Sequence, residues 1–277
     1  MSGAPTLSVV IPAYNNGRTL AETIDSVLSQ EGLDFELIIA DHSSSDDTRA
    51  VMSRYAADPR VTLLDTEAGG GAGRNWNRVS DAAQGEFMKL VCGDDILRPG
   101  TLARQVELLR ASGAVLTACR RDIVDADGKV LMAGWGLRGL RTPMPGDAAV
   151  RKAVLAGSNL FGEPASVTMR RATFVECGGW FDDFPYLIDQ ASYSRVLLHG
   201  SFVPDPEVGA TFRMSSAQWS VALTRDQASQ ARGFHGWLHA EHPTVISSVD
   251  RTIGDIRATL MAHARRLSYR VLERRMR

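Results

Sequence analysis

Strand signals alternate with helix signals through the first hundred residues, and this alternation constrains the fold more than any other feature of the chain. Four short apolar runs predict strands, at 7–11, 35–40, 61–64 and 87–91. Between them, apolar residues recur at helical spacing, as at 19–30. Strands that alternate with helices of about ten residues indicate a parallel sheet with right-handed crossovers. We therefore expect an α/β fold with a mainly parallel central sheet flanked by helices.

Polar side chains follow three of these predicted strands at the point where each one ends. They are Tyr14 and Asn15, Asp41 and His42, and the adjacent acids Asp94 and Asp95. Because ligands bind beyond the carboxyl ends of parallel strands, we expect the three clusters to share one site. Two neighbouring acids at a strand end repel each other and lose solvation, and a divalent cation relieves both costs. A solvated acidic turn is the alternative for this pair.

Beyond residue 100 the pattern predicts further elements around less regular segments. A hairpin is expected around 125–129. Glycine, arginine and proline dominate 134–145, which predicts an irregular loop able to close over a ligand. The stretch 201–213 predicts two short strands, and the last sixty residues are expected to be helical. Pro12 is expected to stop the first strand.

The composition is that of an ordinary globular protein, with 44% apolar and 23% charged residues and a net charge of −1. Nothing in this overall charge indicates a nucleic acid as partner. Cys92, Cys119 and Cys177 are widely spaced, without a CxxC pair, which suits a reducing compartment. No stretch reaches the ~20 apolar residues that span a bilayer, and the N-terminus lacks a basic leader. We expect a cytoplasmic protein, at most peripheral at the inner face of the membrane.

The C-terminal end of the chain is strongly basic. Residues 251–277 hold eight arginines against Asp255 and Glu273, a balance of +6 that leaves −7 for the remaining chain. Apolar residues recur there at spacings of three and four: Ile253, Ile256, Leu260, Ala264, Leu267 and Val271. A helix with this stripe is expected to pack on the body or against a second copy of the chain. The alternative is that its basic character brings it to an anionic membrane.

Six segments, met in order along the chain, form a recognisable set. They are Ser8–Asn16, Ile24–Gln30, Glu36–Thr48, Arg74-Asn75, Gly85-Glu86 and Gly93-Asp94-Asp95. Together they resemble family 2 glycosyltransferases, and the resemblance runs from residue 7 to about residue 213. It implies the GT-A fold, a nucleotide-diphosphate sugar as donor, Mg²⁺ or Mn²⁺ as cofactor, and inversion at the anomeric carbon.

The resemblance assigns a nucleotide site to residues that follow the first two strands. The loop against the nucleotide would consist of Pro12, Ala13, Tyr14 and Asn15. Tyr14 would lie beside the base, and Asp41 would contact the nucleotide. His42 stands where the family commonly has a second acid, which leaves the choice of base open. Arg74 would meet the nucleotide or the diphosphate, because a guanidinium fits phosphate oxygens. The alternatives are a tyrosine packed under the sheet, an aspartate that caps a helix and a surface arginine.

By the same resemblance, Asp94 would bind the metal and the donor, and Asp95 would orient the metal's water shell or the donor sugar. The family often has another acid where this chain has Cys92. A thiol is a poor ligand for Mg²⁺, so we expect Cys92 to pack in the strand. The metal would then be held by the two acids, phosphate oxygens and water. Arg213, after the last strand, would support the diphosphate.

The base that deprotonates the acceptor hydroxyl is assigned, again by resemblance, to Asp189, an acid that opens a predicted helix after a Gly-Gly turn. Its apolar neighbours would raise its pKa and make it a better base. Gly179 and Trp180 in that turn would contact the acceptor. The alternative for Asp189 is a helix cap, with Asp182 and Asp183 as the other candidate bases.

We therefore expect a GT-A catalytic domain over 1–215, with a nucleotide-sugar half near 1–100 and an acceptor half near 101–215, followed by a helical extension over 216–277. The reaction would move a sugar to the hydroxyl of a glycan, a lipid-linked or a small-molecule acceptor. One alternative is a non-catalytic scaffold or nucleotide-binding protein with the same fold. Another is a sugar-phosphate nucleotidyltransferase, which is disfavoured because the loop after the first strand lacks the glycine-rich sequence with arginine and lysine that such chemistry needs.

Overall fold

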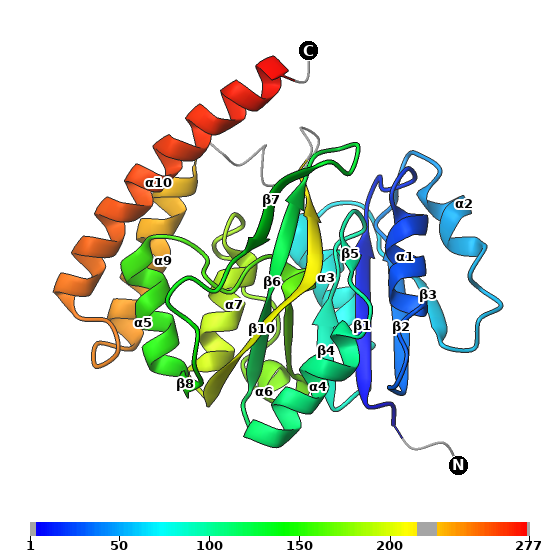
Figure 1. Ribbon diagram of the computed structural model, residues 1–277, viewed down its shortest axis with the longest axis horizontal. Coiled ribbons are helices and arrows are strands. Elements are labelled where there is room, and N and C mark those ends of the chain that lie inside the picture. Colours follow the sequence, from blue (N-terminus) through cyan, green and yellow to red (C-terminus); the bar gives the residue numbers. More distant parts are fainter. Residues whose placement is uncertain (1–3, 215–225, 276–277) are drawn as a thin grey trace.

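The computed structural model describes residues 4–214 and 226–275, with side chains as far as Arg265. Its strands are β1 (Leu7–Ala13), β2 (Phe35–Asp41), β3 (Val61–Asp65), β4 (Phe87–Leu90), β5 (Ile96–Leu97), β6 (Leu116–Val124), β7 (Val130–Trp135), β8 (Met144–Pro145), β9 (Val167–Arg170) and β10 (Ser201–Arg213). Its helices are α1 (Leu20–Leu28), α2 (Thr48–Ser53), α3 (Gly71–Asp81), α4 (Thr101–Ser112), α5 (Gly146–Ala156), the 3₁₀ turn η1 (Pro164–Ser166), α6 (Arg171–Glu176), α7 (Ile188–Leu197), α9 (Gln227–Glu241) and α10 (Ser248–Arg275). Figure 1 shows one central sheet with helices on both sides.

The strands lie in the order β3-β2-β1-β4-β9-β6-β10-β5, with β7 beside β6 and β8 beside β10. As expected, β3, β2, β1 and β4 are parallel. β9 is antiparallel to both β4 and β6, whereas β6 and β10 are parallel. The predicted central sheet with flanking helices is confirmed, and its parallel half carries the three polar clusters.

β1 continues through Pro12 to Ala13, so the expectation that proline stops this strand is wrong. The residues Leu7–Val10 have partners in both β2 and β4. Pro12 and Ala13 pair only with Ala40 and Asp41 of β2. Because the proline lies beyond the part of β1 that is paired on both sides, its missing N–H interrupts no pairing with β4.

The stretch Ser201–Arg213 forms one strand, β10, and not two. Its register against β6 shifts between Asp205 and Val208 and again before Ala210. Such an irregularity bends a strand without ending it, so the sequence signal of a break marks a bulge.

The segment 134–145 is less irregular than expected. β7 extends to Trp135, and Met144 and Pro145 form β8 against β10. Between these strands, Leu137 and Leu140 are buried in the core. Because the core anchors the segment at two leucines, the proposed role as a lid over the donor is not retained.

The sheet separates two apolar clusters. Successive side chains of a strand point to opposite faces, so Val9 and Ile11 of β1 belong to one cluster and Val10 to the other. The first cluster lies between the sheet and α1, α2 and α4, and the second between the sheet and α3, α5, α6 and α7. Helices therefore cover both faces, which leaves the strand ends as the place for a ligand.

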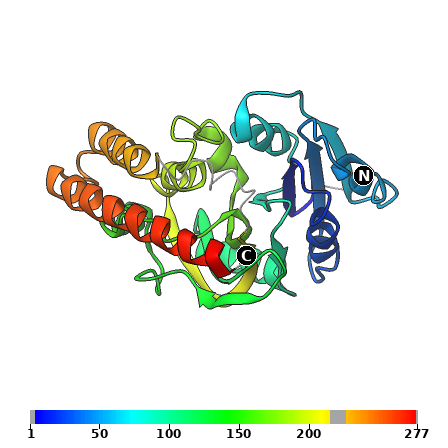
Figure 2. The ribbon, with the colours of Figure 1, turned by 90° about the horizontal axis from the view of Figure 1, so that it is seen from above.

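α10 lies against α5 and α9 at the edge of the molecule (Figures 1 and 2). Its buried residues are Asp250, Gly254, Ala258 and Ala262, four positions apart. The helix packs on the body, as expected, but through these residues and not through the predicted apolar stripe. Ile256 and Leu260 of that stripe are 57% and 64% exposed. Small residues face the body because α5 comes very close: a Cβ added at Gly254 would lie 2.7 Å from the carbonyl oxygen of Val154.

The last positions of the predicted stripe, Leu267 and Val271, lie outside the described side chains. No helix of the described ranges is both long enough and apolar enough to cross a membrane.

Gly157→Ala should destabilise the protein by about 2–4 kcal/mol, because alanine would have to adopt a left-handed φ of +63° and its Cβ would clash with the backbone nitrogen of Ala258 in α10. Gly113→Ala is the matched control. Gly113 also ends a helix, at a φ of +68°, but no atom lies within 4 Å of its Cβ position. We expect the control to lose only about 1 kcal/mol. Urea unfolding followed by circular dichroism measures both losses, and equal losses would contradict the close contact between α5 and α10.

Candidate active site

The carboxyl ends of β1 and β2 form the first part of the site. Ala13 pairs in register with Asp41, and the N–H of His42 donates to the Ala13 carbonyl at 2.9 Å. Tyr14, just beyond β1, is 58% exposed, and its ring centre lies 5.8 Å from that of His42. Tyr14 therefore stands at the edge of the sheet and does not pack under it. Its exposed ring offers a face on which a planar group can stack.

Asn15 ties the loop after β1 to the loop after β2. Its backbone adopts a left-handed φ of 51°. Its N–H donates to the Ser44 hydroxyl at 2.9 Å, and its side-chain oxygen accepts from the N–H of Ser45 at 3.0 Å. The predicted nucleotide loop, Pro12 to Asn15, is therefore held against the residues that follow β2.

Asp41 and His42 are both buried and both held in place. The Asp41 carboxylate accepts from the N–H of Ser44 at 3.2 Å, and α2 begins later with Asp47 at its cap position, so Asp41 is not a helix cap. The ring Nε2 of His42 lies 2.9 Å from the Gly69 carbonyl oxygen. Because a carbonyl can only accept, Nε2 carries a hydrogen, and a neutral ring then presents Nδ1 as an acceptor.

Asn75 of α3 joins the strand ends, a role not expected from the sequence. Its side chain is buried, and the amide nitrogen donates to the carbonyls of Ala13 at 3.2 Å and Ala40 at 3.3 Å. The amide oxygen accepts from the Thr66 hydroxyl at 2.6 Å. A polar residue on the buried face of an amphipathic helix was the signal that could have identified it.

Arg74 lies in the first turn of α3, at the edge of the same site. Its guanidinium donates to the Ala68 carbonyl at 3.1 Å and pairs with Glu67 at 2.8 Å. Both partners belong to the loop whose Gly69 carbonyl holds His42. An exposed ion pair of this kind contributes little stability, so Arg74 can exchange Glu67 for phosphate oxygens at low cost.

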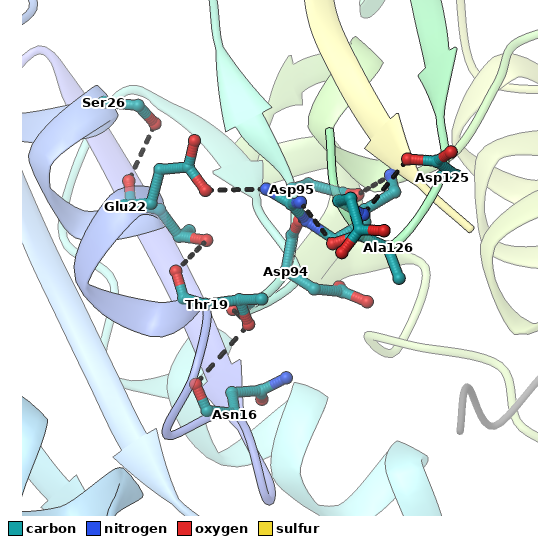
Figure 3. A network of polar contacts seen from close by, with 12 residues as sticks. Asn16, Thr19, Glu22, Ser26, Asp94, Asp95, Asp125 and Ala126 are labelled. Carbon is teal, nitrogen blue, oxygen red and sulfur yellow. Dashed lines mark hydrogen bonds and ion pairs between the residues drawn. The ribbon is translucent and has the colours of Figure 1, made fainter. Parts of the chain in front are cut away.

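The turn with Asp94 and Asp95 is held by Arg213 at the end of β10. Figure 3 shows the polar network around this turn, with Glu22, Asp94, Asp95 and Ala126 labelled. The guanidinium donates to the backbone carbonyls of Asp94 at 3.2 Å and Ala126 at 3.1 Å, and to the Glu22 carboxylate at 2.6 Å. The N–H of Arg213 donates to the Asp95 carboxylate at 3.2 Å. Arg213 is buried and these contacts place its charge inside the protein, so it shapes the acidic turn instead of supporting a diphosphate.

Asp95 is fully buried, and its Oδ2 has no hydrogen-bond partner among the described residues. Burial, and next the charge of Asp94, raise the pKa of Asp95 well above its usual range. A buried carboxylate oxygen beside a second acid is a donor set that suits Mg²⁺ or Mn²⁺. Within the described part of the chain, no group of three or more His, Cys, Asp or Glu side chains could hold a metal ion. The two acids therefore fit only an ion that takes its other ligands from phosphate and water.

Cys92 follows β4, and acids from both halves of the chain act on its thiol. Burial raises the pKa of its thiol well above the usual range, and the charges of Asp95, Asp94, Asp189 and Glu163 raise it further. Asp189 of α7 and the acidic turn after β4 therefore act on the same thiol, and the charge of Glu163 acts on both Asp95 and Asp189. Cys92 itself is half-buried and packs against the core, as expected.

The Asp189 carboxylate accepts two hydrogen bonds. One oxygen accepts from the N–H of Gln190 at 2.6 Å, and the other from the side-chain amide of Asn159 at 2.8 Å. Burial raises the pKa of Asp189 to about 7; the charge of Glu163 adds to this rise, and the two hydrogen bonds oppose it. A carboxylate with such a pKa can accept a proton near neutral pH.

Asn159 and Glu163 were not expected from the sequence. The Asn159 amide also donates to the Gly162 carbonyl at 2.9 Å, which shapes the loop that carries Glu163. Glu163 accepts from the guanidinium of Arg121 at 2.9 Å, and the Arg121 side chain is only 5% exposed. Neither residue stands in a pattern typical of a site, because only the folded loop brings them to Asp189.

The residues expected to contact an acceptor lie against α3 instead. Trp180 is 3% exposed; its indole N–H donates to the Ser80 hydroxyl at 2.8 Å, and its ring centre lies 4.9 Å from that of Trp76. A Cβ added at Gly179 would lie 2.7 Å from the side-chain oxygen of Asn77. The Trp180 ring therefore belongs to the core, and Gly179 allows the turn to approach α3. We assign neither side chain to an acceptor.

The candidate site thus offers three chemical features. An exposed ring and a polar edge lie at the ends of β1 and β2, and two acids able to take a cation follow β4. A half-buried carboxylate with a pKa of about 7 opens α7. Asp182 and Asp183, the other candidate bases, are exposed and offer no comparable environment.

The chain is similar to known sequences. The model of the family described as "Glycosyl transferase family 2" matches residues 8–175. The protein MT1568 of Mycobacterium tuberculosis is 36% identical over 246 residues, which cover 84% of this chain and 76% of the relative. The succinoglycan biosynthesis protein ExoO of Rhizobium meliloti is 35% identical over 127 residues, 46% of this chain and only 36% of ExoO.

Solved structures share the fold at low sequence identity. TarS 1–349 of S. aureus in complex with UDP-GlcNAc gives a TM-score of 0.66 at 15% identity, over 84% of this chain and 66% of that chain. The mannosyltransferase PcManGT from Pyrobaculum calidifontis, in complex with GDP-Man and Mn²⁺, gives 0.61 at 17% identity, over 95% of this chain and 76% of that chain. The expected GT-A fold is confirmed. Because the family model matches more than half of its length, the chain belongs to glycosyl transferase family 2.

Proposed function

We propose that this protein transfers a sugar from a nucleotide-diphosphate donor to an acceptor hydroxyl, with inversion and with a divalent metal. Membership of glycosyl transferase family 2 supports the transfer of a sugar. The observation that carries the finer proposal is the Asp189 carboxylate, which is held by Asn159 and has a pKa raised to about 7, in a fold that also carries the paired acids Asp94 and Asp95 after β4. A direct displacement needs the donor and a proton acceptor at one place, and this arrangement supports such a reaction.

The nucleotide would lie across the ends of β1 and β2. Pro12, Ala13 and Asn15 would form its loop, with the base against Tyr14 and beside Asp41 and His42. TarS and PcManGT are described with UDP-GlcNAc and GDP-Man, so the fold accepts both uracil and guanine. Each of these bases carries a ring N–H, the kind of donor that the Nδ1 of a neutral His42 would accept.

The diphosphate would be held at the acidic turn. A bound Mg²⁺ or Mn²⁺ would neutralise charge on the phosphate oxygens as the donor bond breaks. Asp94 and Asp95 would hold this ion, which would also give the Oδ2 of Asp95 a partner. Arg74 would exchange Glu67 for the diphosphate and so place a fixed positive charge beside it.

Asp189 would act as the base. It would take the proton of the acceptor hydroxyl while the acceptor oxygen attacks the anomeric carbon. The bond from that carbon to the diphosphate oxygen would break, and the electron pair would leave with the diphosphate. Attack on the face opposite the leaving group inverts the anomeric centre. Asn159 would position the Asp189 carboxylate, because it donates to one of its oxygens at 2.8 Å.

The acceptor would be the hydroxyl of a glycan, a lipid-linked sugar or a small molecule. We further propose that the reaction takes place in the cytoplasm, which the three free thiols of Cys92, Cys119 and Cys177 support. The division into a catalytic domain over 1–215 and a helical extension over 216–277 remains part of this proposal.

Thermal unfolding with UDP, GDP, dTDP and CDP, each with and without Mn²⁺, tests the donor site. A nucleotide at roughly a hundred times its Kd should add ~2.7 kcal/mol, which raises the Tm by roughly 5 °C for a chain of this size. We expect a metal-dependent shift that Asp94→Ala abolishes. Asp34→Ala, which removes an exposed acid before β2 at the opposite edge of the sheet, should keep the shift. No shift with any nucleotide would favour the non-catalytic scaffold.

Asp189→Asn should lower the transfer rate by on the order of a hundredfold to ten-thousandfold, the usual contribution of a general base, and leave the nucleotide-dependent Tm shift unchanged. In the unsubstituted protein, kcat/KM should fall as the pH drops below about 7, because protonated Asp189 cannot accept the hydroxyl proton. Rates measured from acid to alkaline pH, with the anomeric configuration of the product read by NMR, test both points. Full activity of Asp189→Asn would assign the base to another residue.

Asn159→Ala and Glu163→Gln should move the acidic limb of the pH profile in opposite directions. Loss of the Asn159 hydrogen bond, which lowers the pKa of Asp189, should move the limb to higher pH. Loss of the Glu163 charge, which raises that pKa, should move it to lower pH. A structural defect alone would lower the rate without shifting the limb, and shifts of the same sign would contradict the positions assigned to these two residues.

A further inference from the structure

The orientation of α10 about its own axis is set by contacts with the body. Asp250 pairs with Arg151 of α5 at 2.9 Å, and Asp255 lies 2.8 Å from the Nδ1 of His235 in α9. Gly254 admits the Val154 backbone where a side chain would collide with it. Polar pairs and a close backbone approach therefore fix which face of α10 points inward, and the helix cannot turn another face to the core without losing them.

The outward face of α10 carries exposed aliphatic side chains, beside Thr252 and His263, where a solvent-facing helix usually carries polar ones throughout. Val249 is 64% exposed, Ile256 57% and Leu260 64%. The sequence repeats this stripe at a spacing of eleven residues, with Leu267 following Ile256 and Val271 following Leu260. A repeat of eleven residues keeps an apolar stripe nearly straight along an α-helix. We call Val249, Ile256 and Leu260 the outer stripe of α10.

The charge around the outer stripe is positive. Arg257 donates to the backbone carbonyl of Leu155 at 2.7 Å, and Arg265 donates to the Tyr186 hydroxyl at 2.8 Å. Both acceptors are neutral, so neither contact removes the arginine charge. The sequence from 251 to 277 carries a balance of +6.

We propose that the outer stripe of α10 docks on the surface of a bilayer that contains anionic lipid, with the helix lying along the membrane plane. A straight apolar stripe would enter the boundary between headgroups and acyl chains, and the arginines would lie at the level of the anionic headgroups. Figures 1 and 2 show α10 along the outside of the molecule. The proposal is independent of the proposed reaction.

The positive charge favours a membrane over a second copy of this chain. Two copies joined through their outer stripes would bring two segments of +6 together, and like charges at short distance oppose such an interface. An anionic surface instead gains from each arginine that approaches it. The oligomeric state is therefore an outcome of the test.

Co-sedimentation of the full chain with vesicles tests the proposal. We expect binding to vesicles of equal parts phosphatidylglycerol and phosphatidylcholine. Binding to phosphatidylcholine alone should be on the order of a hundredfold weaker, because the arginines then have no anionic headgroups to approach. Leu260→Gln should weaken binding to the anionic vesicles by on the order of tenfold, because a buried aliphatic side chain is lost. Val175→Gln, at a position of α6 that is 56% exposed, is the matched control and should bind as the parent does.

Absence of vesicle binding, or equal binding to neutral and anionic vesicles, would overturn the proposal. Equal loss in Leu260→Gln and Val175→Gln would also overturn it, because the outer stripe would then have no special role. Light scattering without vesicles is the remaining measurement: a dimer that Leu260→Gln converts to a monomer would assign the stripe to a second copy of the chain. The melting temperature of each variant confirms that it is folded.

Discussion

The candidate site depends on one buried guanidinium. Arg213 comes from the end of β10, late in the chain, yet it bonds to Glu22 of α1, to the turn of Asp94 and to the hairpin at Ala126. A buried charge is costly unless it is paired and hydrogen-bonded, and Glu22 together with the two carbonyls meets that requirement. These contacts join α1, the hairpin and β10 to the acidic turn. The positions of Asp94 and Asp95 therefore depend on an arginine more than a hundred residues away in the sequence.

Two carboxyl groups of the candidate site, those of Asp95 and Asp189, lie in surroundings that oppose their negative charge. Burial is the largest cause of the raised pKa of both Asp95 and Asp189. For Asp95, one carboxylate oxygen has no hydrogen-bond partner among the described residues and a second acid lies next to it in the sequence, and a cation would relieve both costs. For Asp189, the Asn159 amide and a backbone N–H support the charged form and oppose burial. The same low-dielectric environment thus favours a cation at one acid and a proton at the other.

α3 connects the ends of β1 and β2 with the segment that leads to α7. On its buried side, Asn75 holds the ends of β1 and β2, where the nucleotide would lie. Further along, Asn77 and Ser80 hold the backbone and the ring of Trp180, in the segment that leads to α7 and Asp189. One helix therefore sets the distance between the proposed donor edge and the proposed base, which explains why Trp180 is in the core and does not face an acceptor.

The sequence by itself determined the parallel half of the sheet, because alternating strands and helices leave few other ways to cover both faces. It also determined the polar clusters at the ends of β1, β2 and β4, because parallel strands end at one edge. Only the tertiary structure decided the rest. It brought Asn159 to Asp189 and gave Glu163 its influence on both Asp95 and Asp189, through contacts between segments remote in sequence that no local pattern encodes. It turned Arg213 inward, because Glu22 and two carbonyls were there to receive its charge. It also decided which residues of α10 face the body, because the close approach of α5 admits glycine and alanine and leaves Ile256 and Leu260, which periodicity alone would have buried, exposed.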